Sequence, residues 1–275
     1  MNTIKIILIS IAISLLSINV NAAKLAPCMT GECVDYFNKF KRSAKRGHPV
    51  AMNTLGQFYE YGYGTEKNEE LALKYYEKSS RLDHPVAQYK AGLLYLSSDK
   101  HRDVTKGVNY LEKSAQNKVK KAYFLLGLIY LNKDFGAYDI AKADKYLAKA
   151  YDNKQEDIPV LIDYLNEKNM IEADVFPSLV NSMKKNPVDM GNGLVSVWPD
   201  DGTEVITVVA PPIEEIFHGQ LMSFRQKIKS TGTRFAGMSC KQMKGACFSF
   251  GENIEGAARN QFYTNMIKQS AGSGY

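Results

Sequence analysis

The feature that most constrains this chain is a twelve-residue phrase that returns twice. It reads HPVAMNTLGQFY from His48, HPVAQYKAGLLY from His84, and VKKAYFLLGLIY one unit later. The glycines within it, Gly56, Gly92 and Gly127, are separated by 36 and then 35 positions. A helical phrase that recurs at this period predicts paired helices that stack into an α-solenoid.

The glycine inside the phrase calls for a structural reason, because glycine in a helix costs roughly 1 kcal/mol relative to alanine. Ala51, Leu55 and Tyr59 fall at i, i+4 and i+8 and form one apolar face, with Gly56 beside it. We expect a neighbouring helix to approach so closely there that a Cβ would push the two backbones apart. The predicted repeat core comprises Ala51, Leu55, Gly56, Tyr59, Ala87, Gly92, Tyr95, Ala122, Gly127 and Tyr130.

A second phrase lies between the copies of the first and predicts the second helix of each unit. It reads YYEKSS, YLEKSA and YLAKAY in turn. Pro49 and Pro85 suit the first turn of the first helix, because proline has no N–H to leave unpaired there. Gly62 and Gly64 are placed to end that helix and let the chain turn back.

These residues resemble the Sel-one-like repeat, a relative of the tetratricopeptide repeat found in many exported bacterial proteins. The Ala-x-x-x-Leu-Gly-x-x-Tyr pattern, Gly62-Tyr63-Gly64, and YYEKSS followed by HPVA carry the resemblance, which spans about residues 34–152. SSDKHRD and NKDFGAYD replace Gly-x-Gly in the later units, and the third unit lacks His-Pro. The resemblance implies a right-handed superhelix that contacts other proteins as a scaffold or adaptor.

The resemblance also implies that the first helix of each unit lines the inner surface, where a partner would bind. Two columns there change from polar to apolar along the chain, and a bare apolar surface of this kind is rare in soluble proteins. We expect the apolar end to be covered by the C-terminal region or by a partner; the alternative is that the columns are ordinary inter-helix core. The predicted partner-binding residues are Asn53, Gln57, Tyr89, Leu93, Phe124 and Leu128.

The first residues predict export. Lys5 precedes the apolar run IILISIAISLLSI, and small residues surround a cleavage site after Ala22. The run is short for a membrane span, although a retained anchor is the alternative. We therefore expect a periplasmic or secreted protein with no integral span after cleavage. The net charge of +6 falls to +5 without Lys5, and export argues against nucleic acid as the partner.

The four cysteines form two close pairs, Cys28 with Cys33 and Cys240 with Cys247. An even number of cysteines in an exported chain predicts two structural disulfides, although four cysteines allow three connectivities. Neither spacing is C-x-x-C, so the sequence gives little support to a redox-active pair.

The sequence predicts a mostly α chain with a small α+β module at its end. We divide it into a signal peptide (1–22), a solenoid (23–157), a helical cap or linker (158–189) and an α+β module with a disulfide (190–275). Two β-rich runs around Asp201-Gly202 predict a hairpin in that module. Trp198 is the only tryptophan, and we expect its ring to anchor the module by burial.

The sequence predicts no catalytic residues, no metal site and no cofactor. His48 and His84 belong to the start of the repeat, and no H-E-x-x-H motif or Gly-rich phosphate loop is present. The favoured interpretation is an exported, non-catalytic adaptor for another envelope or secreted protein. The alternatives are a secreted host-contact factor, or a cell-wall enzyme or regulator whose residues to inspect would be Glu214, His218, Thr231 and Arg234.

Overall fold

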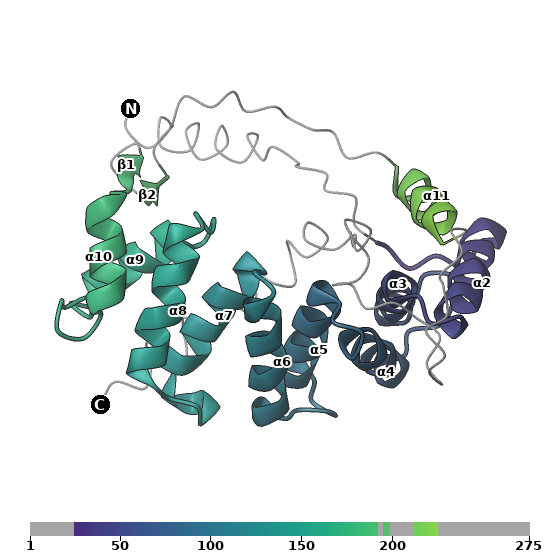
Figure 1. Cartoon of the computed structure of the whole chain (residues 1–275), viewed down its shortest axis with the longest axis horizontal. Helices are drawn as coiled ribbons and strands as arrows, with labels where there is room; N and C mark the ends of the chain where they lie inside the picture. The colour runs from purple at the N-terminus through teal and green to yellow at the C-terminus, as the bar shows by residue number, and fades with distance from the viewer. Residues whose placement is uncertain (1–24, 192–194, 199–211, 225–275) are drawn as a thin grey trace, which may run out of the picture.

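The computed structural model describes residues 25–191, 195–198 and 212–224. In that part of the chain, helices succeed one another along an arc from α2 to α10, and a last helix returns to the beginning (Figure 1). The helices are α2 (Gly31–Lys45), α3 (Pro49–Tyr61), α4 (Glu69–Ser80), α5 (Pro85–Ser97), α6 (Val104–Gln116), α7 (Lys120–Leu131), α8 (Ile140–Asp152), α9 (Ile158–Glu167), α10 (Pro177–Lys185) and α11 (Ile213–Ser223), with a 3-10 turn η1 (Lys133–Phe135) after α7.

Several predictions fall on residues outside these ranges. They are the signal peptide, the hairpin turn at Asp201-Gly202 and the second disulfide. Cys240 and Cys247 both lie outside the described residues, so the bridge between them stays a prediction. The α+β module predicted for residues 190–275 is likewise described only in part, through a short hairpin and α11.

Three helix pairs, α3/α4, α5/α6 and α7/α8, repeat the same contact at their glycines. A Cβ built on Gly56 would lie 2.7 Å from the ring of Tyr76, and one on Gly92 would lie 2.8 Å from Leu111 Cγ. The same atom on Gly127 would lie 2.5 Å from Leu147 Cδ2. The three glycines therefore occupy equivalent places, where the second helix of the unit lies against the first.

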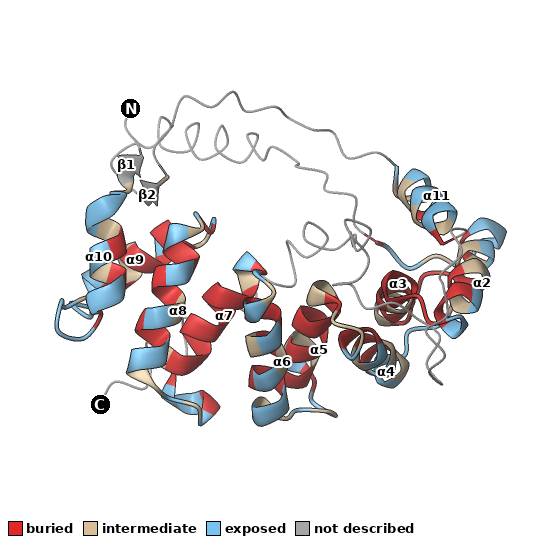
Figure 2. Cartoon of the chain, viewed as in Figure 1, coloured by how far each residue is buried: buried red, intermediate tan, exposed pale blue. Residues whose placement is uncertain are grey.

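The two helices of each pair differ in how far they are buried. Ten of the thirteen residues of α3 and nine of the twelve residues of α7 are buried, and Figure 2 shows these helices mostly red. The second helices α6 and α8 keep a charged face toward solvent and a buried face that includes Leu111 and Leu147. The first helices therefore form the centre of the array, because a helix that is apolar on all sides has to be covered.

The second helices begin with the same capping interaction. The side chains of Asn68, Asp103 and Asp139 each accept a hydrogen bond from the backbone N–H three residues later, at 2.9 to 3.0 Å. These caps satisfy N–H groups that the first turn of a helix leaves without partners. The sequence spacing of the three caps is that of the repeat.

The turns from one unit to the next share a left-handed residue. Gly47, Asp83, Lys118 and Lys154 have φ angles of 93°, 59°, 64° and 50°. Only the first is a glycine, so the other three carry the cost of a conformation that side chains disfavour. The recurrence of this turn shows that the repeat specifies the backbone path even where the residue type changes.

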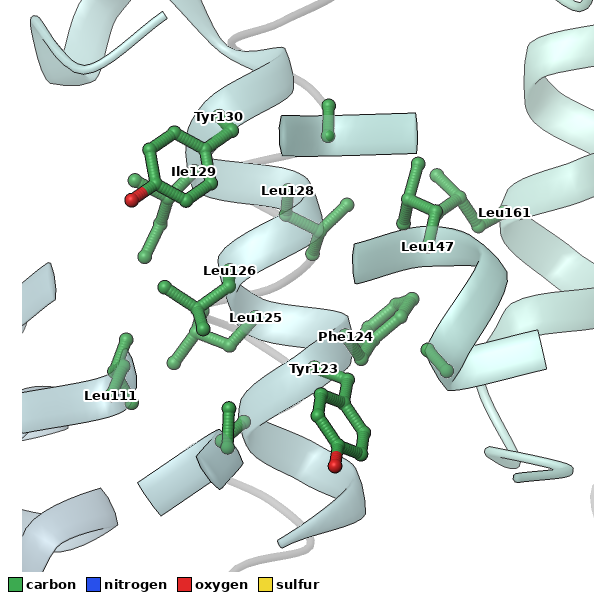
Figure 3. Packing of buried hydrophobic residues seen from close by; sticks show 14 of the residues in the cluster. Leu111, Tyr123, Phe124, Leu125, Leu126, Leu128, Ile129, Tyr130, Leu147 and Leu161 are labelled. Atoms are coloured by element: carbon green, nitrogen blue, oxygen red, sulfur yellow. The ribbon is translucent and has the colours of Figure 1, made fainter. Parts of the chain in front are cut away.

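The hydrophobic core forms two clusters that meet at α5. One holds side chains of α2, α3 and α4, and the other extends from α6 to α10. Figure 3 shows α7 inside the second cluster, between Leu111 of α6 on one side and Leu147 of α8 and Leu161 of α9 on the other.

Beyond the repeats, α9 and α10 continue the array and a short hairpin follows. Asp144 of α8 accepts hydrogen bonds from the backbone N–H groups of Ser178 and Leu179, at 3.0 and 2.8 Å, and so caps α10. The strands β1 (Asp189–Gly191) and β2 (Val195–Val197) pair antiparallel. The described partner of β2 is thus the strand before it, a pairing that was not predicted from the sequence.

Trp198 follows β2 and holds the hairpin against the helices. Its indole Nε1 donates to the backbone oxygen of Gln155 at 3.1 Å, and its ring meets Tyr151 edge-on at 4.9 Å. The residue is half-buried and packs against the second core cluster. Its contacts are with α8 and the turn before α9, so it ties β2 to the solenoid.

Candidate interaction surfaces

The helix α11 packs on α2 and α3 at the N-terminal end of the array. Phe217 is 1% exposed and its ring centroid lies 5.5 Å from that of Phe40 and 5.0 Å from that of Phe58. Two polar contacts fix the position of the helix: Tyr36 donates to the backbone oxygen of Glu214 at 3.3 Å, and Thr54 donates to Gln220 Oε1 at 3.1 Å. A segment from late in the chain thus covers an aromatic face of the first helices.

The junction of α2 and α11 leaves a crevice of about 280 Å³, which we call the α2–α11 crevice. One wall is basic and carries Lys39, Arg42 and Arg46. The other wall comes from α11 and the residue after it. It comprises His218, Leu221, Met222 and Phe224. The crevice therefore combines positive charge with partly exposed apolar surface.

A second hollow of about 480 Å³, the α6–η1 groove, lies between α6 and the connection from α7 to α8. Val108, Glu112 and Tyr130 line its helical side, and Phe135, Tyr138 and Asp139 line its loop side. Tyr138 is 49% exposed. The loop that forms this groove, NKDFGAYD, is one of the segments where the sequence departs from Gly-x-Gly.

A stacked tyrosine pair recurs in every unit, and Tyr130 of the third pair lines the groove. The pairs Tyr59/Tyr75, Tyr95/Tyr110 and Tyr130/Tyr146 have interplanar angles of 8° and centroid separations of 5.7 to 5.8 Å. In the second and third pairs a glutamate of the preceding unit accepts the hydroxyl: Tyr95 donates to Glu77 at 2.6 Å, and Tyr130 to Glu112 at 2.8 Å.

The same glutamates affect the acidity of the stacked tyrosines. Burial, followed by the negative charge of Glu112, raises the pKa of Tyr146 to about 12. Burial and the nearby carboxylate of Glu77 likewise raise the pKa of Tyr110. Tyr110 also donates to Glu77 across the boundary between the first two units, at 3.5 Å.

A buried lysine links the first unit to the second. Lys90 of α5 is 2% exposed, and its Nζ lies 3.8 Å from Glu60 Oε2 of α3 and donates to the hydroxyl of Tyr61 at 3.3 Å. Glu60 also accepts from the hydroxyl of Tyr76. A charge in such a place requires these partners, because an unpaired buried ammonium is costly.

The six predicted partner-binding residues lie mostly inside the chain. Five of them, Asn53, Gln57, Tyr89, Phe124 and Leu128, are at most 5% exposed, and Leu93 is half-buried. Tyr89, Phe124 and Leu128 belong to the second core cluster, which Leu93 joins from its edge. The structure therefore gives these apolar members a packing role, and their contact with a partner stays a prediction.

The two histidines at the start of the repeat are buried, and each lies immediately before a helix. His84 is fully buried, and its Nδ1 accepts from the backbone N–H of Ala87 at 3.2 Å, which caps α5. Burial lowers the pKa of His84 to about 4. His48 precedes α3, and burial together with the charge of Arg46 lowers its pKa.

Of the four residues named for an enzymatic interpretation, Thr231 and Arg234 lie outside the described residues. Glu214 and His218 are both on α11, and His218 lines the α2–α11 crevice with an exposed side chain. Within the ranges that the structure describes, no three His, Cys, Asp or Glu side chains are grouped so that they could hold a metal ion.

The first cysteine pair is close in space. The Cα atoms of Cys28 and Cys33 are 6.0 Å apart, which is a separation that a disulfide spans. Cys28 also exchanges backbone hydrogen bonds with the Gly62–Gly64 turn, donating to Gly62 O at 3.0 Å and accepting from Gly64 N–H at 2.6 Å. These backbone hydrogen bonds hold the segment before α2 against the turn that ends α3.

The structure does not describe the second cysteine pair, Cys240 and Cys247. The disulfide predicted between Cys240 and Cys247 rests on their spacing in the sequence alone, because neither residue is described. The structural role assigned to that bridge therefore stays a prediction.

The docking of α11 and the burial of Lys90 were not predicted from the sequence. Phe217 and Phe224 are seven positions apart, and this spacing could have indicated one apolar face of a helix. It carries no information about which surface that face meets. The burial of Lys90 could have been inferred from its position in the middle of α5, the first helix of the second unit, among mostly apolar residues.

Comparison with known protein families gives three consecutive matches to the Sel1 repeat, at residues 49–84, 85–119 and 120–154. A putative sel1-like repeat-containing protein of Acanthamoeba polyphaga mimivirus is 31% identical over 123 residues, which are 43% of this chain and 22% of that protein. The chitin synthase regulator SKT5 of Saccharomyces cerevisiae is 36% identical over 66 residues, 22% of this chain and 10% of that protein. The similarity thus covers only a minor part of either relative.

Two solved structures share similarity over 56% of this chain. A Sel1 repeat protein from Oxalobacter formigenes is 19% identical, with a TM-score of 0.46 and 64% of that chain covered. A protective antigen present in uropathogenic Escherichia coli strains is 15% identical, with a TM-score of 0.48 and 33% of that chain covered. Among the residues described in our structure, no helix combines the length and the apolar character needed to cross a membrane.

Proposed function

This chain is a Sel1-repeat protein over residues 49–154, and from that premise we propose that it is an exported, non-catalytic scaffold for other proteins of the bacterial cell envelope. Sel1 repeats indicate a scaffold for protein–protein interaction. The location in the envelope, the absence of catalysis and the choice of partner belong to the proposal.

The observation that carries the proposal is the equivalence of the three units. Each places its glycine against the second helix and stacks its tyrosine pair in the same geometry. Units that repeat at this precision extend a surface in one direction without a change of fold, and repeat arrays use such surfaces to bind other proteins. The charged outer faces of α6 and α8 and the α6–η1 groove are parts of that surface.

Export is supported by the N-terminal sequence and by the first cysteine pair. We propose that Cys28 and Cys33 form a disulfide, because bridges of this kind persist in oxidising compartments such as the periplasm. Mass spectrometry of the protein purified from its native cells tests both points. We expect a mature N-terminus at Ala23 and no alkylation of these two cysteines before reduction. A retained N-terminus or free thiols would contradict the export proposal.

The same experiment extends to the other two cysteines. Export predicts that Cys240 and Cys247 are also protected from alkylation before reduction, and that proteolytic fragments containing them are joined by one bridge. Free thiols at these two positions, with the first pair oxidised, would remove the second disulfide and leave the export proposal standing on the first.

The predicted partner-binding residues form the second part of the proposal. Since five of the six are buried, Leu93 is the member that a partner reaches first. Its neighbour Leu94 is also half-buried but packs against the first core cluster instead of the second. Leu94 is therefore a matched control of the same type, on the same helix and in the same class of burial.

The experiment compares Leu93→Ser with Leu94→Ser by cross-linking in intact cells followed by affinity purification. We expect the Leu93 variant to lose at least one captured envelope protein that the wild type and the Leu94 variant retain, at equal melting temperatures. Equal capture by the two variants would remove Leu93 from the binding surface. No captured protein with any of the three would overturn the scaffold role itself.

A further inference from the structure

We propose that the α2–α11 crevice binds an acidic segment of a partner protein. Arg42 and Arg46 hold a carboxylate of that segment, and Leu221 and Met222 contact an apolar side chain next to it. This inference rests on the proposed scaffold function and adds to it a surface and the chemistry of the segment that the surface takes.

The basic wall of the crevice carries positive charge that nearby acids do not balance. Lys39 is already paired with Asp35, at 2.5 Å, whereas Arg42 and Arg46 take part in no salt bridge among the described residues. Both are exposed, and one helical turn separates them, so they lie on one face at the end of α2. The helix dipole there is equivalent to about half a negative charge, which offsets only part of two guanidinium groups.

The facing wall of the crevice is apolar and partly exposed. Met222 is 43% exposed, and Leu221 beside it is half-buried. Phe224 lies at the base, 8% exposed, with its ring 5.9 Å from Phe40 and 4.9 Å from His48. A ligand that offered only a negative charge would leave this apolar wall in water. A segment with an acidic and an apolar residue side by side satisfies both walls.

The size of the crevice suits a short stretch of peptide. A volume of about 280 Å³ corresponds to roughly nine water molecules at about 30 Å³ each, which is the space of a few side chains. A flat anionic surface such as a membrane would meet the exposed guanidinium groups but would not enter the crevice. The guanidinium group pairs with carboxylates through two parallel hydrogen bonds, so an acidic peptide fits the geometry and the volume together.

The test measures binding of fluorescein-labelled octapeptides to the full chain by fluorescence anisotropy. The probe peptide carries a leucine flanked by glutamates. One control peptide has glutamine in place of glutamate, and another has glycine in place of leucine. We expect the probe to bind best, and each control peptide to bind about tenfold more weakly, since a lost charge pair or apolar contact of about 1.4 kcal/mol changes affinity tenfold.

Two double variants decide whether the site is the crevice. Arg42→Gln/Arg46→Gln should weaken binding of the probe at least tenfold. Lys184→Gln/Lys185→Gln removes the same charge from the last turn of α10, where both lysines are exposed, and should change binding less than twofold. Equal losses in the two double variants would show binding by net charge alone and would overturn the proposal.

A single variant tests the apolar contact separately from the charge contacts. Its result does not depend on whether the arginine variants fold. Met222→Ser should weaken binding of the leucine peptide about fivefold and leave binding of the glycine peptide unchanged. Equal effects on the two peptides would contradict an apolar contact at this wall. Binding of phosphatidylglycerol vesicles that requires Arg42 and Arg46, without binding of the peptide, would replace the acidic segment by a lipid surface and overturn the proposal.

The outcomes also distinguish this inference from the scaffold role. If the peptide fails to bind but cross-linking still captures an envelope protein, the crevice is excluded and the scaffold role stands. If the peptide binds through Arg42 and Arg46 but no protein is captured in cells, the site stands and the scaffold role falls.

Discussion

Gly127 of α7 lies directly against Leu147 of α8, so closely that a Cβ on the glycine would be 2.5 Å from Leu147 Cδ2 and 2.7 Å from its Cγ. The contact joins the two helices of the third unit. The glycine is therefore a requirement of packing.

Gly127→Ala should destabilise the protein although alanine is the better helix former. Overpacking of a filled core costs about 1 to 3 kcal/mol, and over most of that range the cost exceeds the gain of about 1 kcal/mol in helix propensity. Gly219 of α11 has no atom within 4 Å of a built Cβ, so Gly219→Ala is the matched control and should be neutral or slightly stabilising. Urea unfolding followed by circular dichroism measures both. A stable Gly127 variant would show that the helices can separate without penalty.

Lys90→Met should destabilise the protein by about 1 to 3 kcal/mol, because it leaves the carboxylate of Glu60 without its buried partner. The exposed pair Lys100–Glu70, at 3.6 Å with both side chains 72% exposed, provides the control. Lys100→Met should have no measurable effect on the midpoint of unfolding, since solvent screens such pairs. If the two variants behave alike, the Lys90 contact does not link the first two units.

Asp144→Ala should detach α10 from α8. The carboxylate caps two N–H groups of α10, and the loss of a helix cap costs about 1 to 2 kcal/mol. Amide hydrogen exchange should accelerate in residues 177–185 while residues 49–116 keep their protection. Asp152→Ala, an exposed aspartate at the end of α8, is the control. Uniform acceleration along the chain would contradict a local role.

His84 should make the protein less stable in mild acid. Its pKa is about 4 in the folded chain against an ordinary value of 6.5, so the unfolded chain takes up a proton first as the pH falls. The stability that depends on neutral His84 is complete above pH 6.5 and is lost progressively toward pH 4. The loss over that window is about 3 kcal/mol at most.

Urea unfolding at about pH 7, 5.5 and 4 measures this dependence. His84→Asn retains a side chain that can cap α5 and should flatten the decline between pH 6.5 and 4. His218→Asn, at an exposed position, should leave it unchanged. An unaltered decline in the His84 variant would place the acid sensitivity elsewhere.

Phe217→Ala should release α11 from the first helices, at a cost of about 3 to 5 kcal/mol for a fully buried aromatic ring. Limited proteolysis should then cut within residues 212–224 before the repeats are degraded. Glu215→Ala alters an exposed residue of the same helix and should leave the cleavage rate as in the wild type. Equal resistance in the Phe217 variant would mean that other contacts hold the helix.

The parts of this fold that the sequence predicted are those encoded by contacts within a unit. The place of Gly56, Gly92 and Gly127 follows from spacing alone, since residues four and eight apart share a helix face. The left-handed Gly62 at the end of α3, with φ of 78°, follows from local backbone chemistry in the same way.

The parts that could not be predicted depend on contacts between distant segments. The exact rotation of the first helices decides whether Tyr89 and Phe124 face a partner or the core, and a shift of one position changes the answer. The position of α11 depends on the contact of Phe217 with Phe40, which are more than 170 positions apart in the sequence. The periodicity within each segment gives no information about that contact.

The position of α11 also sets an order of events during synthesis. Phe40 and Phe58 leave the ribosome well before Phe217, which covers both of them, and at about 5 to 20 residues per second the delay is of the order of ten to thirty seconds. During that interval α2 and α3 lack the helix that later covers their aromatic face. Until α11 arrives, the end of the chain that was made first therefore carries an aggregation hazard that the finished protein no longer has.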